Sequence, residues 1–319
     1  MIKKIYKSLL GKYKTIKCFI QDYKNFVNIK KVSTKKDELI ANIMLCIHQL
    51  EKGMSFTTNS REFGGEKAFI LTRLATEYET LYSNDQITNL AFNVLCKYLE
   101  CNNSTKNTKY KNIIESYISK SVYKYDKNVG GTKIVSSPAI INKEIIESFY
   151  YSRSSVREFS TNTINKQDIL SAMKIAVSTP SACNRQASRV HVITKKEQIQ
   201  KIIENQLGDQ GWCNNATTLF IITVNRTFFS IERERHQAFI DGGMYAMNFA
   251  MGLHLNNIAS CFKMYINDSD KEDEFYKLSD IPTYEQPIVL LLAGYYKNTT
   301  VTSPKSERLS LNTQIYFHE

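Results

Sequence analysis

The chain has 319 residues, of which 42% are hydrophobic and 23% charged, a composition typical of a folded globular protein and not of a disordered one. Its formal net charge is +11, but residues 1–36 hold eleven lysines and one acid, Asp22, which leaves the remainder nearly neutral. The basicity therefore belongs to an N-terminal arm. That arm contains no arginine and lacks the interleaved arginines and aromatic rings of nucleic-acid readers, so we expect no nucleic-acid partner.

The seven cysteines are odd in number and form no Cys-x-x-Cys pair. This pattern argues against a disulfide framework or a zinc ribbon, and it predicts reduced thiols in a cytoplasmic protein. No apolar run approaches the roughly 20 residues that cross a bilayer. The basic N-terminus is not followed by a long apolar stretch with a cleavage site, so we expect no signal peptide.

The basic arm, residues 1–36, is predicted to form an amphipathic helix over residues 2–27. Apolar side chains recur there at steps of three and four on one helical face, at Ile2, Ile5, Leu9, Tyr13, Ile16, Ile20, Tyr23 and Val27. We interpret this face as packing on the protein itself, with solvated lysines outside. Peripheral contact of the arm with an anionic membrane or an acidic partner is the alternative.

Residues 37–140 are predicted to be mainly α-helical, with helices over 37–54, 66–81, 87–99 and 111–123 and a polar loop over 101–109. A Gly/Ser/Pro-rich stretch at 129–138 is the best domain boundary. We therefore expect three regions: the arm 1–36, the helical region 37–140 and a domain over 141–319. His48 and Glu51 could share a helix face, but a metal site needs more ligands, so we favour an ordinary helix end at Gly53.

The pattern changes after residue 141, where predicted helices alternate with predicted strands. The helices span 142–152, 166–178, 197–206, 232–255 and 270–278, and the strands span 190–194, 219–224, 259–264 and 286–294. This alternation predicts an α/β or α+β core with a mixed sheet flanked by helices.

The most informative stretch is 151–160, Tyr-Ser-Arg-Ser-Ser-Val-Arg-Glu-Phe-Ser. Arg153 and Arg157 lie four residues apart, with the hydroxyls of Ser152, Ser154 and Ser155 between or beside them. A guanidinium offers a fork of donors that matches phosphate oxygens, so one or two turns of such residues predict a phosphate-monoester site. Ordinary arginines at the start of a surface helix are the alternative.

A second stretch, 178–188, reads Ser-Thr-Pro-Ser-Ala-Cys-Asn-Arg-Gln-Ala-Ser. Pro180 forces an extended turn. Asn184 and Gln186 then present two carboxamides to the same side of an extended segment. A carboxamide both donates and accepts hydrogen bonds, which suits the edge of a heterocycle such as the flavin pyrimidine. A polar loop that caps the following strand is the alternative.

Together with Pro304-Lys-Ser-Glu-Arg308, these stretches make residues 145–319 resemble the FMN-dependent nitroreductase family. The resemblance implies an α+β (α/β sandwich) fold, a nitroreductase-like mixed central sheet flanked by helices, preceded here by a mainly α-helical N-terminal region. It also implies an intertwined homodimer with two FMN sites at the interface. The helix rich in small residues over 232–252 is then the candidate interface helix.

The resemblance also implies the roles of individual residues. The FMN phosphate would be held by Arg153, Ser154, Ser155, Arg308 and Lys305. The flavin ring would be bound by Asn184 and Gln186 beside the backbone of Pro180, Ser181 and Ala182. Arg157 would lie near the ring, where a cation stabilises the reduced flavin. The sequence departs from the family at Ala187-Ser188, where many members carry proline and an aromatic residue.

The resemblance finally implies an NAD(P)H-dependent oxidoreductase that passes hydride through FMN to an organic acceptor in a ping-pong cycle. No catalytic side chain is required, since the flavin carries the chemistry. Two other functions remain open at this point. One is an FMN-dependent oxidase or dehydrogenase of a biosynthetic intermediate, for example in polysaccharide synthesis. The other is a non-enzymatic protein of the membrane surface with a degenerate core.

Overall fold

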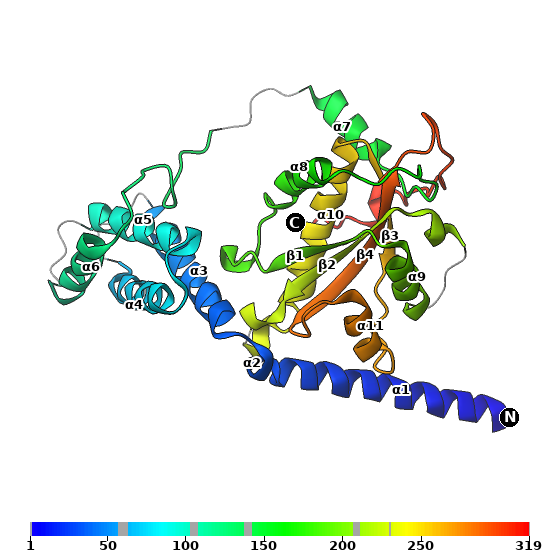
Figure 1. Ribbon diagram of the computed structural model, residues 1–319, viewed down its shortest axis with the longest axis horizontal. Helices are drawn as coiled ribbons and strands as arrows, with labels where there is room; N and C mark the ends of the chain where they lie inside the picture. The colour runs from blue at the N-terminus through cyan, green and yellow to red at the C-terminus, as the bar shows by residue number, and fades with distance from the viewer. Residues whose placement is uncertain are drawn as a thin grey trace.

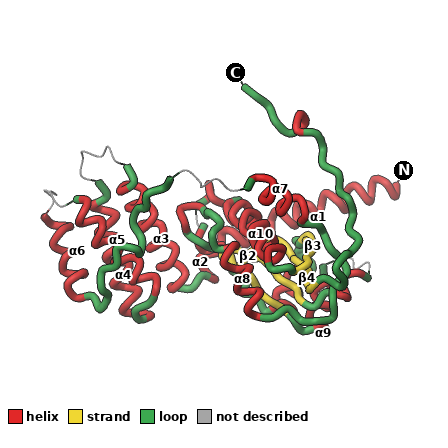
Figure 2. The backbone as a smooth tube through the Cα atoms, turned by 90° about the horizontal axis from the view of Figure 1, so that it is seen from above, coloured by secondary structure: helices red, strands yellow, loops and turns green. Residues whose placement is uncertain are grey.

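The computed structural model describes residues 2–56, 63–102, 108–136, 142–206, 211–229 and 231–318. Its helical N-terminal part lies beside an α+β core, as Figures 1 and 2 show. The predicted loop at 101–109 and the predicted boundary at 129–138 lie partly outside the described residues. The limits of the three predicted regions remain predictions.

The core contains a four-stranded sheet in the order β1-β2-β4-β3. The strands are β1 (Ser188–Ile193), β2 (Thr218–Asn225), β3 (Ile258–Met264) and β4 (Glu285–Tyr295). The α+β fold is confirmed, but each of these strands pairs antiparallel with its neighbours. Within the described residues, the parallel component of the expected mixed sheet is reduced to one isolated bridge between Ser155 and Ser260.

Helices cover both faces of this sheet, which makes its central strand fully buried. All eight residues of β2 are buried, and the side chains of residues 219–222 alternate between two apolar clusters. Helices α8 (Lys166–Ala176) and α10 (Gln237–Leu255) pack on the face that carries Phe220 and Ile222. Helices α9 (Lys196–Asn205) and α11 (Glu272–Ser279) pack on the face that carries Leu219 and Ile221.

Four further helices form a unit with its own apolar core. They are α3 (Lys35–Met54), α4 (Gly65–Tyr82), α5 (Gln86–Cys101) and α6 (Thr108–Lys120). Thr34 caps α3 because its side chain accepts a hydrogen bond from the backbone N–H of Asp37. Glu51, considered above as a metal ligand, instead accepts a 2.8 Å hydrogen bond from the backbone N–H of Gly131. The described residues contain no group of three or more possible metal-ligating side chains.

Helices α1 (Ile2–Val27) and α2 (Ile29–Val32) precede this unit. The prediction that the apolar face of α1 packs on the protein is wrong for the described side chains of that face, which are 47–67% exposed: Tyr13, Ile16, Ile20, Tyr23 and Val27. Polar residues of α1 contact the core. Asn25 donates to the Glu272 carboxylate over 3.1 Å, the Asn267 amide donates to Asp22 over 3.0 Å, and Lys17 pairs with Asp270. None of the described helices is both long and apolar enough to span a bilayer.

Gly252 permits the close packing of α10 on α8, and this generates a prediction about stability. A Cβ atom there would lie 2.4 Å from the backbone oxygen of Ala172. We expect Gly252→Ala to destabilise the protein by about 1–3 kcal/mol, because backbone must move to admit the methyl group. Thermal unfolding measures this. Gly11→Ala in α1 is the control: a Cβ atom there meets nothing within 4 Å, and the change should raise stability slightly. Equal melting temperatures for the two variants would contradict this packing.

Candidate functional site

The arginine–serine stretch is extended, and not the turn that its sequence suggested. Helix α7 (Lys143–Ser152) ends just before it. Residue 155 then forms the bridge to Ser260 at the start of β3, and the N–H of Ser160 donates to the carbonyl of Tyr295 over 2.8 Å. The side chains of Val156 and Phe159 are buried in the core. Those two apolar anchors fix the stretch along the β3 edge of the sheet.

Two of the predicted phosphate ligands, Arg153 and Ser155, lie at this edge together with Arg157, which was predicted to lie near the ring. Arg157 donates to the carbonyl of Ser155 over 3.2 Å. Burial raises the pKa of the neighbouring Cys261 thiol, and the positive charges of Arg157 and Arg153 oppose that rise, so both guanidiniums act on the same spot. The hydroxyl of Ser303 donates to the Ser155 carbonyl over 3.1 Å. This contact places Ser303, two residues before Lys305, beside Ser155.

The two tail cations are exposed and have local partners. Lys305 pairs with Glu307, and Arg308 donates to the carbonyl of Ser306 over 2.6 Å. Both contacts join residues that are two positions apart, so neither one ties Lys305 or Arg308 to the serines.

Sequence reasoning did not assign a role to His254. This residue lies near the C-terminal end of α10, beside the arginine–serine stretch. Its Nε2 lies 2.8 Å from the hydroxyl of Ser152, and its ring stacks on Phe149 at 5.0 Å between centroids. Burial lowers the pKa of His254, and the charge of Arg153 lowers it further. The imidazole is therefore kept neutral beside the arginine. The sequence offered only a lone histidine on a helix.

The predicted ring-binding segment is not extended. Residues Ala182–Asn184 form a 3-10 turn, and Cys183, Asn184 and Gln186 have φ values of 53°, 51° and 53°. The argument that an extended segment points both carboxamides to one side is therefore wrong. Both side chains are nevertheless exposed. Non-glycine residues in the left-handed region are strained, and such strain is concentrated at binding and active sites.

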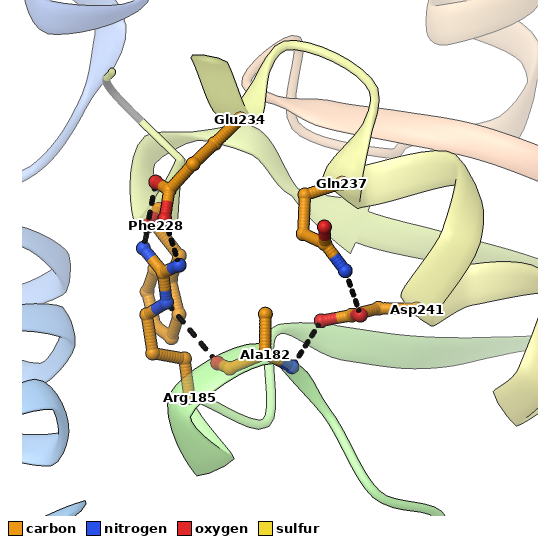
Figure 3. A network of polar contacts seen from close by, with 6 residues as sticks. All are labelled: Ala182, Arg185, Phe228, Glu234, Gln237 and Asp241. Carbon is orange, nitrogen blue, oxygen red and sulfur yellow. Dashed lines mark hydrogen bonds and ion pairs between the residues drawn. The ribbon is translucent and has the colours of Figure 1, made fainter.

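Arg185, which the sequence analysis did not single out, holds this strained turn in place (Figure 3). Its guanidinium is buried and binds Glu234 through two nitrogens, one of them at 3.0 Å from the carboxylate. The same side chain donates to the carbonyls of Ala182 and Phe228 and lies 4.6 Å above the ring of Phe229. This ion pair between the buried Arg185 and the half-buried Glu234 therefore links the turn to the segment before α10.

Asp241 holds the other side of the turn, as Figure 3 also shows. Its carboxylate accepts a 3.0 Å hydrogen bond from the backbone N–H of Ala182 and a 2.7 Å hydrogen bond from Gln237. Asp241 lies in the first half of α10, so this contact places the ring-binding segment at the N-terminal end of that helix.

A cavity of about 410 Å³ opens beside this segment, lined by Pro180, Ser181 and Gln186 among others. Its wall includes a polar pair, since His191 Nε2 lies 2.7 Å from a carboxylate oxygen of Glu285. Burial alone would raise the pKa of Glu285, but hydrogen bonds from His191 and Thr223 bring that pKa below its ordinary value. Glu285 is therefore an ionised acceptor at the base of the cavity.

The structure does not bring the two halves of the predicted site together within one chain. Asp241 and His254 lie thirteen residues apart on α10, about 20 Å along the helix axis. The positions of the two halves in the sheet also separate them, because Ser260 lies in one edge strand and Ser188 lies in the other. Their register levels also differ by six residues of β2, from Thr218 to Val224, which is another 20 Å or so. The halves occupy opposite corners of the sheet.

Comparison with known proteins supports one family. The model of the nitroreductase family matches residues 150–295. No curated protein matches the sequence significantly. A putative NADH dehydrogenase/NAD(P)H nitroreductase of Parabacteroides distasonis is 15% identical over 56% of this chain and 99% of its own, with a TM-score of 0.48. A nitroreductase with bound FMN from Desulfitobacterium hafniense is 19% identical over 56% of this chain and 100% of its own, with a TM-score of 0.44.

The ion pair of the buried Arg185 with Glu234 generates a prediction about the turn. We expect Arg185→Ala to destabilise the protein by on the order of 3 kcal/mol, because it leaves carbonyls and a carboxylate without their donor. Chemical denaturation measures this. The control is Arg233→Ala, since the Arg233 side chain is 89% exposed beside Glu232 and should change stability by less than about 0.5 kcal/mol. Similar losses for the two variants would show that the pair does not anchor the turn.

A second prediction concerns the charge beside His254. Burial and Arg153 both lower the pKa of this histidine, so Arg153→Ala should raise it. The pKa should still remain below the ordinary value because the ring stays buried. NMR titration of the imidazole protons measures this. Arg157→Ala, which removes the other guanidinium, should leave the His254 pKa in place. If the pKa of His254 were unchanged in Arg153→Ala, the Arg153 guanidinium would not lie close to this imidazole.

Proposed function

Since residues 150–295 form a domain of the nitroreductase family, we propose that this protein is an oxidoreductase that binds FMN. In this proposal, electrons pass from NAD(P)H to an organic acceptor in a ping-pong cycle. The observation that carries it is the presence of two complementary half-sites: arginines and serines at one corner of the sheet, and exposed carboxamides on a strained turn at the other.

The proposal includes a homodimer, because the ligand is too short to reach both half-sites of one chain. The ribityl linker of FMN is about as long as three residues of extended backbone, roughly 10 Å. The half-sites are about 20 Å apart along α10 alone. A second copy could place its turn beside the phosphate half-site of the first. Each ligand would then lie between two chains.

The exposed face of α10 supports this assembly. Ile240, Met244 and Met247 follow one helical face and are all exposed, and a Cβ at Gly243 between them would meet nothing within 4 Å. Helix α7 exposes Ile145, Tyr150 and Tyr151 as well. Apolar surface of this extent marks a protein interface in soluble proteins. The predicted interface helix therefore presents the side chains that an interface needs.

The residues fit FMN in charge and in hydrogen-bonding capacity. Arg153, Ser154 and Ser155, with Arg308 and Lys305 from the tail, would hold the phosphate, whose charge matches the guanidiniums. Asn184 and Gln186 of the partner copy would pair with the donors and acceptors at the ring edge, beside the backbone of Pro180, Ser181 and Ala182. Bound FMN would supply the hydride chemistry, which needs no protein nucleophile.

Two further groups would act on the bound ring and on the acceptor. Arg157 would place a fixed positive charge where negative charge develops on reduction, which lowers the energy of the reduced state. The strained backbone of the turn would preorganise the carboxamides, which lowers the conformational entropy that is lost when the ligand binds. The cavity beside Gln186 would admit the donor and the acceptor in turn.

The first test of this function is flavin binding. Purified protein should be yellow or should gain the visible absorbance of bound flavin when titrated with FMN. Arg153→Ala combined with Arg308→Ala should weaken FMN binding at least about a hundredfold, since each removes charged hydrogen bonds to the phosphate. Arg233→Ala is the control and should bind normally. A colourless protein that never binds FMN would refute the proposal.

Mixed dimers extend this test to the shared site. One subunit carries Arg153→Ala and Arg308→Ala, and the other carries Asn184→Ala and Gln186→Ala, with different tags for purification. If the site is shared, one of the two sites in each mixed dimer contains no substitution and binds FMN normally. If each site lies within one chain, both sites are damaged and the mixed dimer binds no better than the variants alone.

A further inference from the structure

Helix α1 carries an apolar stripe whose described side chains are exposed. The exposed fractions are 64% for Tyr13, 57% for Ile16, 48% for Ile20, 67% for Tyr23 and 47% for Val27. Phe19, beside this stripe, is 69% exposed. Isolated apolar residues on a surface need no explanation, but a continuous row along a helix marks a binding surface.

The stripe points away from the core. Successive residues of a helix are turned by about 100°. The side of α1 that meets the core includes Asp22, Asn25 and Cys18, and the stripe residues Ile16, Ile20 and Val27 fall on the opposite side. Figure 1 shows α1 along one margin of the molecule, with the core on one side of it and its N-terminal half projecting past the core. A flat surface could therefore meet the stripe.

Lysines flank the stripe and indicate what that surface is. Residues 2–27 contain seven lysines and one acid. Lys12 borders the stripe on one side and Lys24 on the other, and both are exposed. A helix with an apolar face, lysine borders and amphipathic tyrosines is suited to the headgroup region of an anionic bilayer.

The same row spacing would also suit a coiled coil with a second copy, but the charges oppose it. Coiled-coil partners place opposite charges beside the apolar seam. Two copies of α1 would instead bring lysines together, since Asp22 is the only acid in the helix and is used in the contact with Asn267. Charge complementarity therefore selects an anionic surface.

We propose that α1 is an interfacial anchor that docks the protein on anionic membranes, with its apolar stripe inserted between lipid headgroups. The contacts of Lys17, Asp22 and Asn25 with the core then set the orientation of the docked domain. This anchor is independent of the proposed flavin chemistry, because the stripe shares no residue with either half-site.

Vesicle co-sedimentation of the full-length protein tests the proposal. The wild type should sediment with vesicles of phosphatidylcholine and phosphatidylserine and remain free with phosphatidylcholine alone. Ile20→Asp should weaken binding at least about fiftyfold, because it removes an inserted side chain and adds a repelled charge. Thr15→Asp makes the same charge change on an exposed site off the stripe, and it should weaken binding only about fivefold. Far-UV circular dichroism of all three proteins confirms that they are folded.

Three outcomes would overturn the anchor. Failure of the wild type to bind anionic vesicles would reject a membrane as the occupant. Equal losses of vesicle affinity for Ile20→Asp and Thr15→Asp would show that only the added charge matters and that the stripe is not inserted. If Ile20→Asp instead changed the oligomeric mass in light scattering while vesicle binding stayed normal, the stripe would be an interface between copies.

Discussion

The length of α10 is the constraint on which the candidate site depends. Near its start, Asp241 binds the backbone of the strained turn, and at its end, His254 binds the segment that carries the arginines. A helix buried against a sheet and against α8 cannot shorten, so the two half-sites stay about 20 Å apart. Within this geometry, a ligand that needs both a phosphate clamp and a ring-binding turn requires two chains. The proposed dimer thus follows from distances in a single protomer.

The N-terminal helices contact the strained turn at residues 182–186 through a shared apolar cluster. Ala41 of α3 belongs to one apolar cluster with Ala187, Phe228 and Phe229, and Ala182 packs against it. Arg185 runs through this region and is buried by it. Left-handed conformations at three non-glycine residues cost energy that surrounding contacts must offset. The helical region, which lies outside the residues that the family model matches, therefore supports the turn.

The sequence predicted the elements well because most of them have strong periodicity or clear caps. The helix predicted over 142–152 is observed as α7, and the Asn142 side chain caps it by accepting from the N–H of Ile145. The α+β class followed from the alternation of helices and strands. The relative orientation of the strands did not follow, because an apolar run such as 219–224 is compatible with both parallel and antiparallel pairing. The stretches at Arg153 and Asn184 were recognised by residue type, but their backbone conformations depend on distant partners such as Ser260 and Glu234.

Dependence on partners that are distant in sequence also explains why the packing of α1 was predicted wrongly. Periodicity identifies an apolar stripe, but the side of the helix that meets the core is set by Glu272, Asn267 and Asp270, far away in sequence. Those polar contacts direct the stripe outward. The apolar residues on α10 belong to a different helix. Docking through α1 and pairing through α10 therefore use separate surfaces, so the two proposed associations do not compete for the same residues.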